Sequence, residues 1–167
     1  IVAGTFTTDA KEGTNEALID SDYTWSEAEN DTWTLVRKPN VAKIGEVGYT
    51  SLQKAVAAVQ DGETITLEAN ETFTEKNYYD NNGWKDGLGY AGDKSFTIDL
   101  GGKTVSQNGA LNDYLIWIKN EGSKANTITI KNGTLDAGTT AYCALCTASS
   151  HDNQLTINLE DVNLINN

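Results

Sequence analysis

Alternating apolar and polar residues recur along this chain with a period of about thirty residues. The clearest copy is the segment 126–136, in which two isoleucines alternate with threonines before the dipeptide Asn132-Gly133. Alternation with a period of two predicts a half-buried strand, and Asn-Gly predicts that the chain turns after it. Similar segments precede and follow this one, around Gly101-Gly102 and Glu160-Asp161. A fixed repeat of strand and turn predicts units that stack and share one core.

The period also predicts which apolar side chains lie side by side. Aligning three copies gives three columns, with one residue from each copy. The columns are Ile98, Ile128 and Ile157; Leu100, Ile130 and Leu159; and Val105, Leu135 and Leu164. If neighbouring strands pair in this register, each column repeats at the strand spacing of roughly 4.8 Å and forms a continuous core.

One helix is predicted before the first repeat strand, over residues 51–60. Its apolar residues share one helical face and are Leu52, Ala55, Val56 and Val59. Thr50 and Gln53 have the spacing of a capping box, and Asp61-Gly62 is a typical stop. We expect this helix to cover the open end of the stacked repeats, where apolar side chains would otherwise meet water.

The first 43 residues have a different pattern. The segments 23–26 and 32–36 alternate and predict a β-hairpin, and Ala10–Asp20 is a candidate short helix. Ile1–Phe6 has the same spacing of apolar residues and Gly-Thr as the repeat segment that ends at Leu135. We therefore predict two domains: 1–43, the end of a preceding repeat plus a linker hairpin, and 44–167, the repeat domain. The chain starts at Ile1 without the pattern of a signal peptide, so we expect a piece of a longer polypeptide.

From Ile44 onward the chain resembles the repeats of large bacterial surface proteins with a pectate-lyase-like fold. The matching segments are Val47–Tyr49, Ser51–Gly62, Thr64–Leu67, Ile98–Thr104 and Ile130–Thr134. The resemblance implies an all-β, right-handed parallel β-helix (a solenoid) with an N-terminal capping helix, preceded by the hairpin and linker. It also implies an extracellular location on a bacterial cell surface, as an adhesin stalk or spacer. Its motifs specify a scaffold and no chemistry.

The charge balance narrows the classes of partner. The chain has 24 acidic residues against 12 lysines and arginines, a net charge of -12. Nucleic acids and anionic membranes both require a basic surface, so neither is expected as a partner. The longest apolar run, Leu115–Ile118, is far too short to span a membrane.

The segment 77–93 interrupts the repeat and is the main candidate for binding, because insertions in repeat proteins often carry function. Its aromatic residues stand among asparagine, aspartate and glycine, a mixture that suits stacking on sugars and hydrogen bonding to hydroxyls. The candidate glycan-binding residues are Tyr78, Tyr79, Trp84 and Tyr90. Packing of these rings against the helix or the hairpin is the alternative. Asp80, Asn82 and Asp86 could also hold calcium, although their spacing is not that of an EF-hand.

Catalysis is not expected. Glycoside hydrolysis requires converging carboxylates, whereas the predicted alignment places Asp99 beside Thr129 and Asn158. The single arginine, Arg37, lies in the linker and not on a repeat. We predict a non-enzymatic module with no catalytic residue, metal or cofactor. The alternative is a fragment of a carbohydrate-active enzyme, either a polysaccharide lyase or a glycoside hydrolase.

Cys143 and Cys146 form a CxxC pair in a segment that alternates like a strand. In a straight strand the two sulfurs would point to opposite faces, with Cα atoms about 10 Å apart, beyond the reach of a disulfide. Reduced thiols are therefore predicted. A disulfide requires a bend in the strand, and a zinc site with His151 and Asp152 is the third alternative.

Two segments are candidates for assembly through strand edges. They contain Ile1, Val2, Thr5 and Phe6 at one end and Leu164 and Ile165 at the other. An uncovered last strand exposes unpaired backbone groups and an apolar face, which favours β-augmentation by another strand. The expected partner is a second copy joined head to tail, which would extend into filaments, or an adjacent repeat of the same polypeptide.

Overall fold

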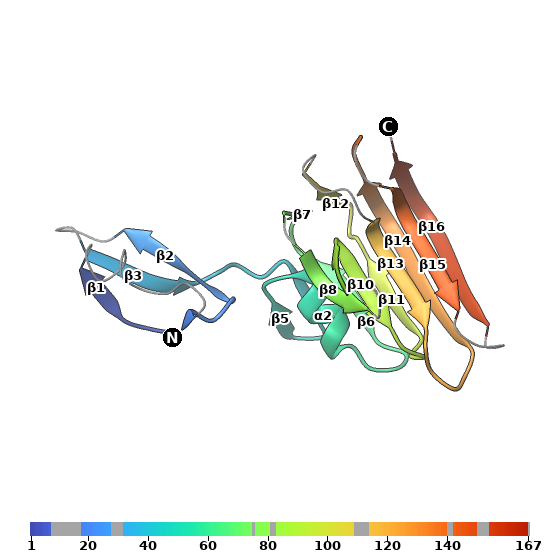
Figure 1. Ribbon diagram of the computed structural model, residues 1–167, viewed down its shortest axis with the longest axis horizontal. Helices are drawn as coiled ribbons and strands as arrows, with labels where there is room; N and C mark the ends of the chain where they lie inside the picture. Colours follow the sequence, from blue (N-terminus) through green and yellow to red (C-terminus); the bar gives the residue numbers. More distant parts are fainter. Residues whose placement is uncertain are drawn as a thin grey trace. The chain divides into compact units, whose positions relative to one another are not determined.

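The computed structural model describes residues 1–7, 18–27, 32–74, 76–80, 83–108, 114–139, 142–149 and 154–166. The chain divides into two compact units, Ile1–Pro39 and Asn40–Asn167. The division falls within the proline-containing linker that follows the N-terminal strands. Each unit has its own sheet structure and is described by itself (Figure 1).

The first unit is a three-stranded antiparallel sheet in the order β1-β3-β2. Its strands are β1 (Thr5–Thr7), β2 (Tyr23–Glu27) and β3 (Thr32–Arg37). The two segments predicted as a hairpin pair antiparallel, with Trp25 opposite Leu35. Phe6 packs edge-on against Trp25, with ring centroids 5.2 Å apart. The segment expected to continue a repeat therefore lies at the edge of this small sheet, and most of the candidate helix falls outside the described residues.

The second unit contains the helix α2 (Leu52–Ala58) and three further sheets in its described part. An eight-stranded sheet has the order β5-β4-β6-β11-β14-β12-β7, with β16 also paired to β14. A three-stranded sheet has the order β10-β13-β15, and β8 and β9 form a hairpin. The strands are β4 (Ala42–Ile44), β5 (Val47–Tyr49), β6 (Thr64–Leu67), β7 (Glu71–Phe73), β8 (Lys76–Asp80), β9 (Gly83–Asp86), β10 (Leu88–Ala91), β11 (Phe96–Asp99), β12 (Thr104–Gln107), β13 (Tyr114–Asn120), β14 (Asn126–Asp136), β15 (Cys143–Ser149) and β16 (Leu155–Ile165).

The predicted right-handed parallel β-helix is wrong: the described strands form separate sheets of mixed and parallel pairing and do not close into a solenoid. Two features interrupt the regular path. β4 enters antiparallel to both β5 and β6, and the segment 76–86 leaves the repeat as the antiparallel hairpin β8–β9. The all-β class is compatible with the structure, and the parallel pairing of segments about thirty residues apart is present within two of the sheets.

One of the predicted columns is confirmed in full. In the other two, Ile128 pairs with Ile157 and Ile130 with Leu159 as predicted, and only the first copy is shifted. Val105, Leu135 and Leu164 are paired as predicted, but Ile98 lies opposite Ile130 and not opposite Ile128. Seven positions separate Ile98 from Val105, against five between Ile130 and Leu135, because the first copy turns through the glycines at 101 and 102. A slip of two residues preserves the face on which each side chain lies, so apolar columns still form.

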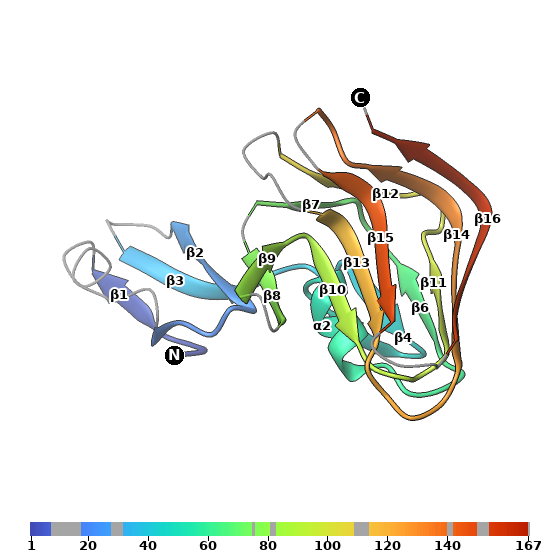
Figure 2. The same ribbon diagram turned by 45° about the vertical axis from the view of Figure 1, so that its right-hand side comes forward.

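The core lies between the sheet β10-β13-β15 and the strands β6, β11 and β14 (Figure 2). Its residues come from both sides and include Leu115, Ile116, Ile118, Ile98, Ile128, Ile130 and Leu135, each at most 1% exposed. Along β11 and the first half of β14, buried apolar residues alternate with less buried threonines, which is the pattern of a half-buried sheet. In β13 the consecutive residues Leu115 and Ile116 are both buried.

Helix α2 covers one end of this core, as predicted from its apolar face. Leu52, Ala55 and Val56 are buried, and the helix packs against β4, β5, β6 and β10. Its cap differs from the predicted capping box. The N-cap is Ser51, whose Oγ accepts a hydrogen bond from the Lys54 N–H at 3.2 Å, while Gln53 is used elsewhere.

Candidate functional site

Two adjoining cavities lie between α2, the β8–β9 hairpin and β10, and together we call them the aromatic groove. Their volumes are about 320 and 290 Å³. Gln53, Gly89, Tyr90 and Ala91 line both cavities. The first cavity is also lined by Val56, Ala57, Gly92, Asp93 and Lys94, and the second by Asn77, Tyr78, Tyr79 and Trp117.

Gln53 fixes the helix to the floor of the groove. Its Nε2 donates to the Gly89 carbonyl at 3.0 Å, and its Oε1 accepts from the Gly89 N–H at 2.8 Å. A paired amide–backbone contact of this kind holds the first turn of α2 against β10. The helix therefore serves both as the cover of the core and as one wall of the groove.

Tyr78 and Trp117 form the aromatic wall. Their rings stack at 14° with centroids 5.8 Å apart, and Tyr78 is only 7% exposed. The Tyr78 ring lies directly over Gly89, where an added Cβ would come within 2.0 Å of it. Glycine is required here for this close approach. For Tyr78 the structure supports packing, the alternative to direct ligand contact.

Trp117 was not predicted as a site residue, because it lies far from the 77–93 segment in the sequence. It reaches the groove because β10 and β13 pair in parallel with Gly89 opposite Trp117. One signal in the sequence could have indicated it. In the run 115–118 Trp117 is the one aromatic residue among aliphatic residues.

Among the predicted residues whose side chains the structure describes, Tyr79 is the most available for contact, with 65% of its surface exposed. Tyr90 is half-buried; its ring packs edge-on against Phe96 and its hydroxyl accepts from the Lys94 N–H at 2.9 Å. Burial raises the pKa of Tyr90, so the phenol stays neutral. Trp84 pairs with Tyr79 across the hairpin, but its side chain lies outside what the structure describes, as do those of Asp80 and Asp86 and the whole of Asn82.

The charged residues of the groove are held by the protein itself. Asp93 accepts a hydrogen bond from the Ser123 N–H at 3.0 Å through Oδ2. Lys94 donates from Nζ to the Val59 carbonyl at 2.8 Å. What remains for a ligand is aromatic surface with neutral polar groups at the rim, such as the Asn77 amide. Concave sites of this composition suit small, uncharged, partly apolar ligands.

The carboxylates considered for catalysis lie elsewhere. Burial works to raise the pKa of Asp99, but hydrogen bonds from Asn132 and the Gly101 N–H, together with the Lys131 charge, hold it below its usual value. Asp93 is the one carboxylate among the described side chains that lines the groove. Among the described residues, no group of three histidine, cysteine, aspartate or glutamate side chains is placed to hold a metal ion.

Glu71 has an unusual environment next to the helix. Burial raises the pKa of its carboxyl to about 7, against the opposing effect of a hydrogen bond from the Leu52 N–H at 2.7 Å. It lies at the start of α2, outside the set of residues that line the groove. We assign it a role in seating the helix.

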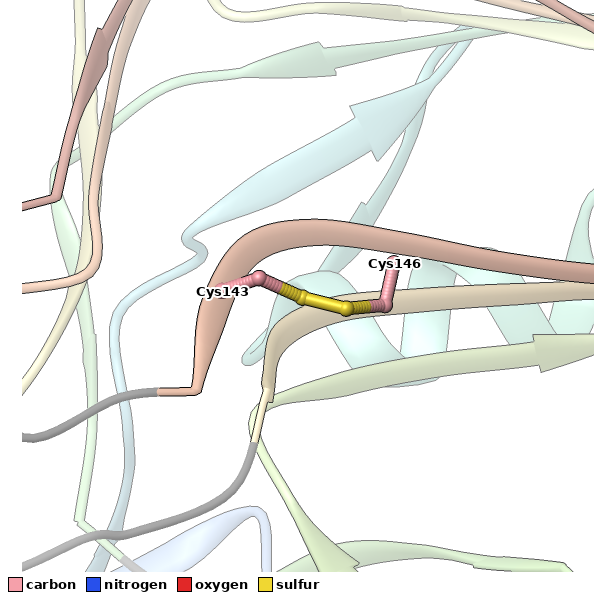
Figure 3. The surroundings of a disulfide bond; sticks show 2 residues. All are labelled: Cys143 and Cys146. Carbon is pink, nitrogen blue, oxygen red and sulfur yellow. A yellow bond between two sulfur atoms is a disulfide. The ribbon is translucent and has the colours of Figure 1, made fainter.

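The prediction of reduced cysteines is wrong, because Cys143 and Cys146 form a disulfide (Figure 3). Their Cα atoms are 6.2 Å apart, well short of the separation expected in a straight strand, because the chain bends at Cys143. The zinc alternative requires free thiolates, which a disulfide does not supply, and His151 and Asp152 lie outside the described residues. Cys146 lies opposite Trp117 in the register of β13 and β15, so the disulfide borders the aromatic wall.

Replacing both Cys143 and Cys146 with serine is expected to lower the free energy of unfolding by about 2 kcal/mol, the loop-closure entropy for so short a loop. Urea denaturation of the oxidised protein and of the variant measures the difference. A reducing agent should lower the free energy of unfolding of the wild type by a similar amount. It should leave the free energy of unfolding of the variant unchanged. An equal effect of the reducing agent on both proteins would contradict the assignment.

Comparisons with known proteins assign the groove no role: no family model, curated protein or solved structure matches the chain. The resemblance to bacterial surface repeats stays a prediction. Across the part of the chain that the structure describes, no helix combines the length and apolar character needed to cross a membrane.

Proposed function

We propose that this chain is a non-enzymatic, extracellular scaffold module that contacts glycans through the aromatic groove. The observation that carries the proposal is the groove itself. It combines the Tyr78–Trp117 wall with the exposed ring of Tyr79, and its two cavities adjoin. A sugar ring has apolar faces and polar edges, so it can stack on aromatic surface while its hydroxyls bond to amides and backbone groups at the rim.

The charge distribution favours neutral glycans over acidic ones. Lys94 is the one cation among the described residues that line the groove, and its ammonium group already donates to Val59. The net charge of -12 repels uronic acids, sialic acids and sulfated sugars. Neutral hexose oligomers avoid this repulsion.

An extracellular location is supported by the disulfide between Cys143 and Cys146. Structural disulfides persist in oxidising compartments and are rare in the cytosol. A bacterial cell surface and the role of stalk or spacer rest on the resemblance of the repeats. The proposed module is a β-rich unit with the aromatic groove as its contact site.

Tyr79→Ala is expected to reduce binding on an array of neutral oligosaccharides at least tenfold, because one good stacking contact contributes about 1.4 kcal/mol. Tyr142→Ala is the matched control, since Tyr142 is another exposed tyrosine, 82% accessible, that does not line the groove. Both variants should keep the wild-type melting temperature.

Two results would contradict the proposal: no array binding by the wild type, or equal losses in the Tyr79 and Tyr142 variants. Trp84→Ala extends the test to the residue that faces Tyr79 across the hairpin. Lost binding at unchanged stability would place Trp84 in the site, whereas a large loss of stability would make it a packing residue.

A further inference from the structure

The first cavity of the aromatic groove has a polar corner, formed by Tyr90 and Asp93, which both line it. The Tyr90 hydroxyl accepts a hydrogen bond from the Lys94 N–H at 2.9 Å, and among the described residues none accepts the proton of that hydroxyl. Asp93 accepts from the Ser123 N–H through Oδ2 at 3.0 Å, and its Oδ1 receives no hydrogen bond from a described residue. The polar corner therefore presents one hydrogen-bond donor and one acceptor to the cavity.

The donor and the acceptor of the polar corner lie close to each other. Burial raises the pKa of Tyr90, and the negative charges of Asp93 and Asp61 raise it further, so the phenol keeps the proton that it donates. Gly92 leaves this hydroxyl uncovered, because an added Cβ there would come within 2.7 Å of the Tyr90 oxygen. A hydroxyl donor beside a carboxylate acceptor matches two neighbouring hydroxyl groups of a ligand, one of which accepts while the other donates.

A buried pair of asparagines holds the backbone of the polar corner in place. Asn126 is 3% exposed, and Asn120 is 1% exposed. The Asn126 Nδ2 donates to the Gly92 carbonyl at 3.4 Å and to the Lys94 carbonyl at 3.1 Å, so it spans the residue between them, Asp93. The Asn120 Nδ2 in turn donates to the Asn126 Oδ1 at 2.8 Å. Satisfied polar networks of this kind make a segment rigid, and a rigid segment binds at a lower entropic cost.

The two cavities of the groove differ in character. The second has the Tyr78–Trp117 wall and the exposed ring of Tyr79, whereas the first has the polar corner. Their volumes, about 320 and 290 Å³, are at the lower end of the range for small-molecule sites, roughly 300–1,000 Å³. Each cavity therefore suits one sugar ring. Because Gln53 and Gly89 line both cavities, two linked rings can occupy them together.

We propose that the first cavity is a second sugar subsite, in which Asp93 and Tyr90 recognise two adjacent hydroxyl groups of a neutral hexose. One sugar hydroxyl donates to Asp93 Oδ1, and its neighbour accepts from the Tyr90 hydroxyl. The next ring of the same oligosaccharide stacks in the second cavity. The inference rests on the proposed glycan function and deepens it, because it makes a disaccharide with an unsubstituted vicinal diol the smallest complete ligand.

Asp93 and Tyr90 are the residues that determine specificity in this arrangement. Aromatic surface stacks on the apolar face of a sugar ring with little regard to the position of its hydroxyls. A site built to hydrogen-bond a hydroxyl rejects the analogue that lacks it, because the polar groups of the protein are then left unpaired. A ring without one of the two hydroxyls is accordingly a poor ligand for the first cavity.

NMR titration with glucose, galactose and mannose, and with cellobiose, maltose, lactose and mannobiose, tests the assignment. At least one disaccharide should bind tenfold more tightly than its constituent monosaccharides, because its second ring bonds to the polar corner. Asp93→Asn and Tyr90→Phe should each lower the affinity for that disaccharide roughly tenfold, the effect of losing a hydrogen bond to a ligand hydroxyl.

Deoxy analogues of the same disaccharide show whether the contact is direct. With the wild type, removal of either of two adjacent hydroxyls should lower the affinity roughly tenfold. With Asp93→Asn, one of these two analogues should bind as well as the parent disaccharide, because the contact that it lacks is already lost. A full further loss for both analogues would overturn the assignment of Asp93.

Asp61→Asn and Tyr114→Phe are the matched controls. Asp61 places a negative charge near Tyr90 but does not line the groove. Tyr114 is a half-buried tyrosine outside the groove, and its ring packs against Tyr142 with centroids 6.4 Å apart. Both controls should bind the disaccharide like the wild type. Circular dichroism melts establish that every variant is folded.

Failure of the proposed function and failure of this inference give different results. Absence of binding by the wild type to every neutral glycan overturns both. If Tyr79→Ala abolishes disaccharide binding while Asp93→Asn and Tyr90→Phe leave it unchanged, the proposed function stands and the second subsite is overturned. Equal affinities for the disaccharide and its monosaccharides also overturn the second subsite, as does an Asp61→Asn variant that binds as weakly as Asp93→Asn.

Discussion

Val56→Asp is expected to lower the free energy of unfolding by roughly 4 kcal/mol, the scale of an unpaired charge placed in an apolar core. Val56 is 2% exposed and belongs to the cluster that includes Leu52 and Ile65. The new carboxylate would displace α2 from the end of the core, and the Gln53–Gly89 contact that shapes the groove would be lost with it. Urea denaturation measures the loss, and glycan binding should weaken in parallel.

Ala57→Asp is the control, because Ala57 is the next residue of the same helix and is exposed. It introduces the same charge one residue further along the same helix, on its exposed side, so its effect on stability should stay within about 0.5 kcal/mol. Equal destabilisation by the two substitutions would show that helix propensity, and not burial, determines the result. Unchanged stability of Val56→Asp would rule out the packing of α2 on the core.

The second large effect is a dependence of stability on pH that originates at Glu71. The folded pKa of about 7 lies above the usual 4.5, so folding favours the neutral carboxyl. Below pH 4.5 the group is protonated in both states and imposes no penalty. Between pH 4.5 and 7 the Glu71 carboxyl is ionised in the unfolded chain but still protonated in the folded one. The free energy of unfolding therefore falls by about 3 kcal/mol across this range. Above pH 7 the contribution is constant.

Glu71→Gln should remove this dependence, since the amide oxygen can still accept from the Leu52 N–H while no charge is buried. We expect the variant to match the wild type near pH 4.5 and to exceed its stability by about 3 kcal/mol above pH 7. Glu68→Gln is the control: its ion pair with Lys43 at 3.2 Å is exposed, and its loss should change stability by less than about 1 kcal/mol. Destabilisation of Glu71→Gln at every pH would mean that the ionised carboxylate stabilises the start of the helix.

The aromatic groove was partly predictable. The clustering of tyrosines in a segment that interrupts the repeat pointed to Tyr78, Tyr79 and Tyr90, which all line it. The division of roles among them was not predictable. Tyr78 is buried because Gly89 lets its ring approach the backbone, and Trp117 joins the wall through parallel strand pairing. The burial of Tyr78 and the position of Trp117 both depend on which strands lie next to β10.

The disulfide was not predicted because the strand that contains both cysteines was taken to be straight. A uniform strand geometry placed Cys143 and Cys146 on opposite faces. In the structure the chain bends at Cys143 as it enters its pairing with β13, and the bend brings the two sulfurs together. A pattern of alternating residues predicts a strand but says nothing about where that strand curves.

The elements of this protein follow from interactions between near neighbours in the sequence. Alternating isoleucine and threonine produced the strands, and the stripe that contains Val56 produced the helix that covers the core. Register and closure depend instead on pairing between distant segments. A turn longer by two residues moved Ile98 from its predicted partner to Ile130. The side chain stays on the same face of the sheet, because side chains alternate between the two faces with a period of two. The division into separate sheets and the antiparallel pairing of the hairpin over 76–86 became visible only in the folded chain, because both depend on which distant strands pair.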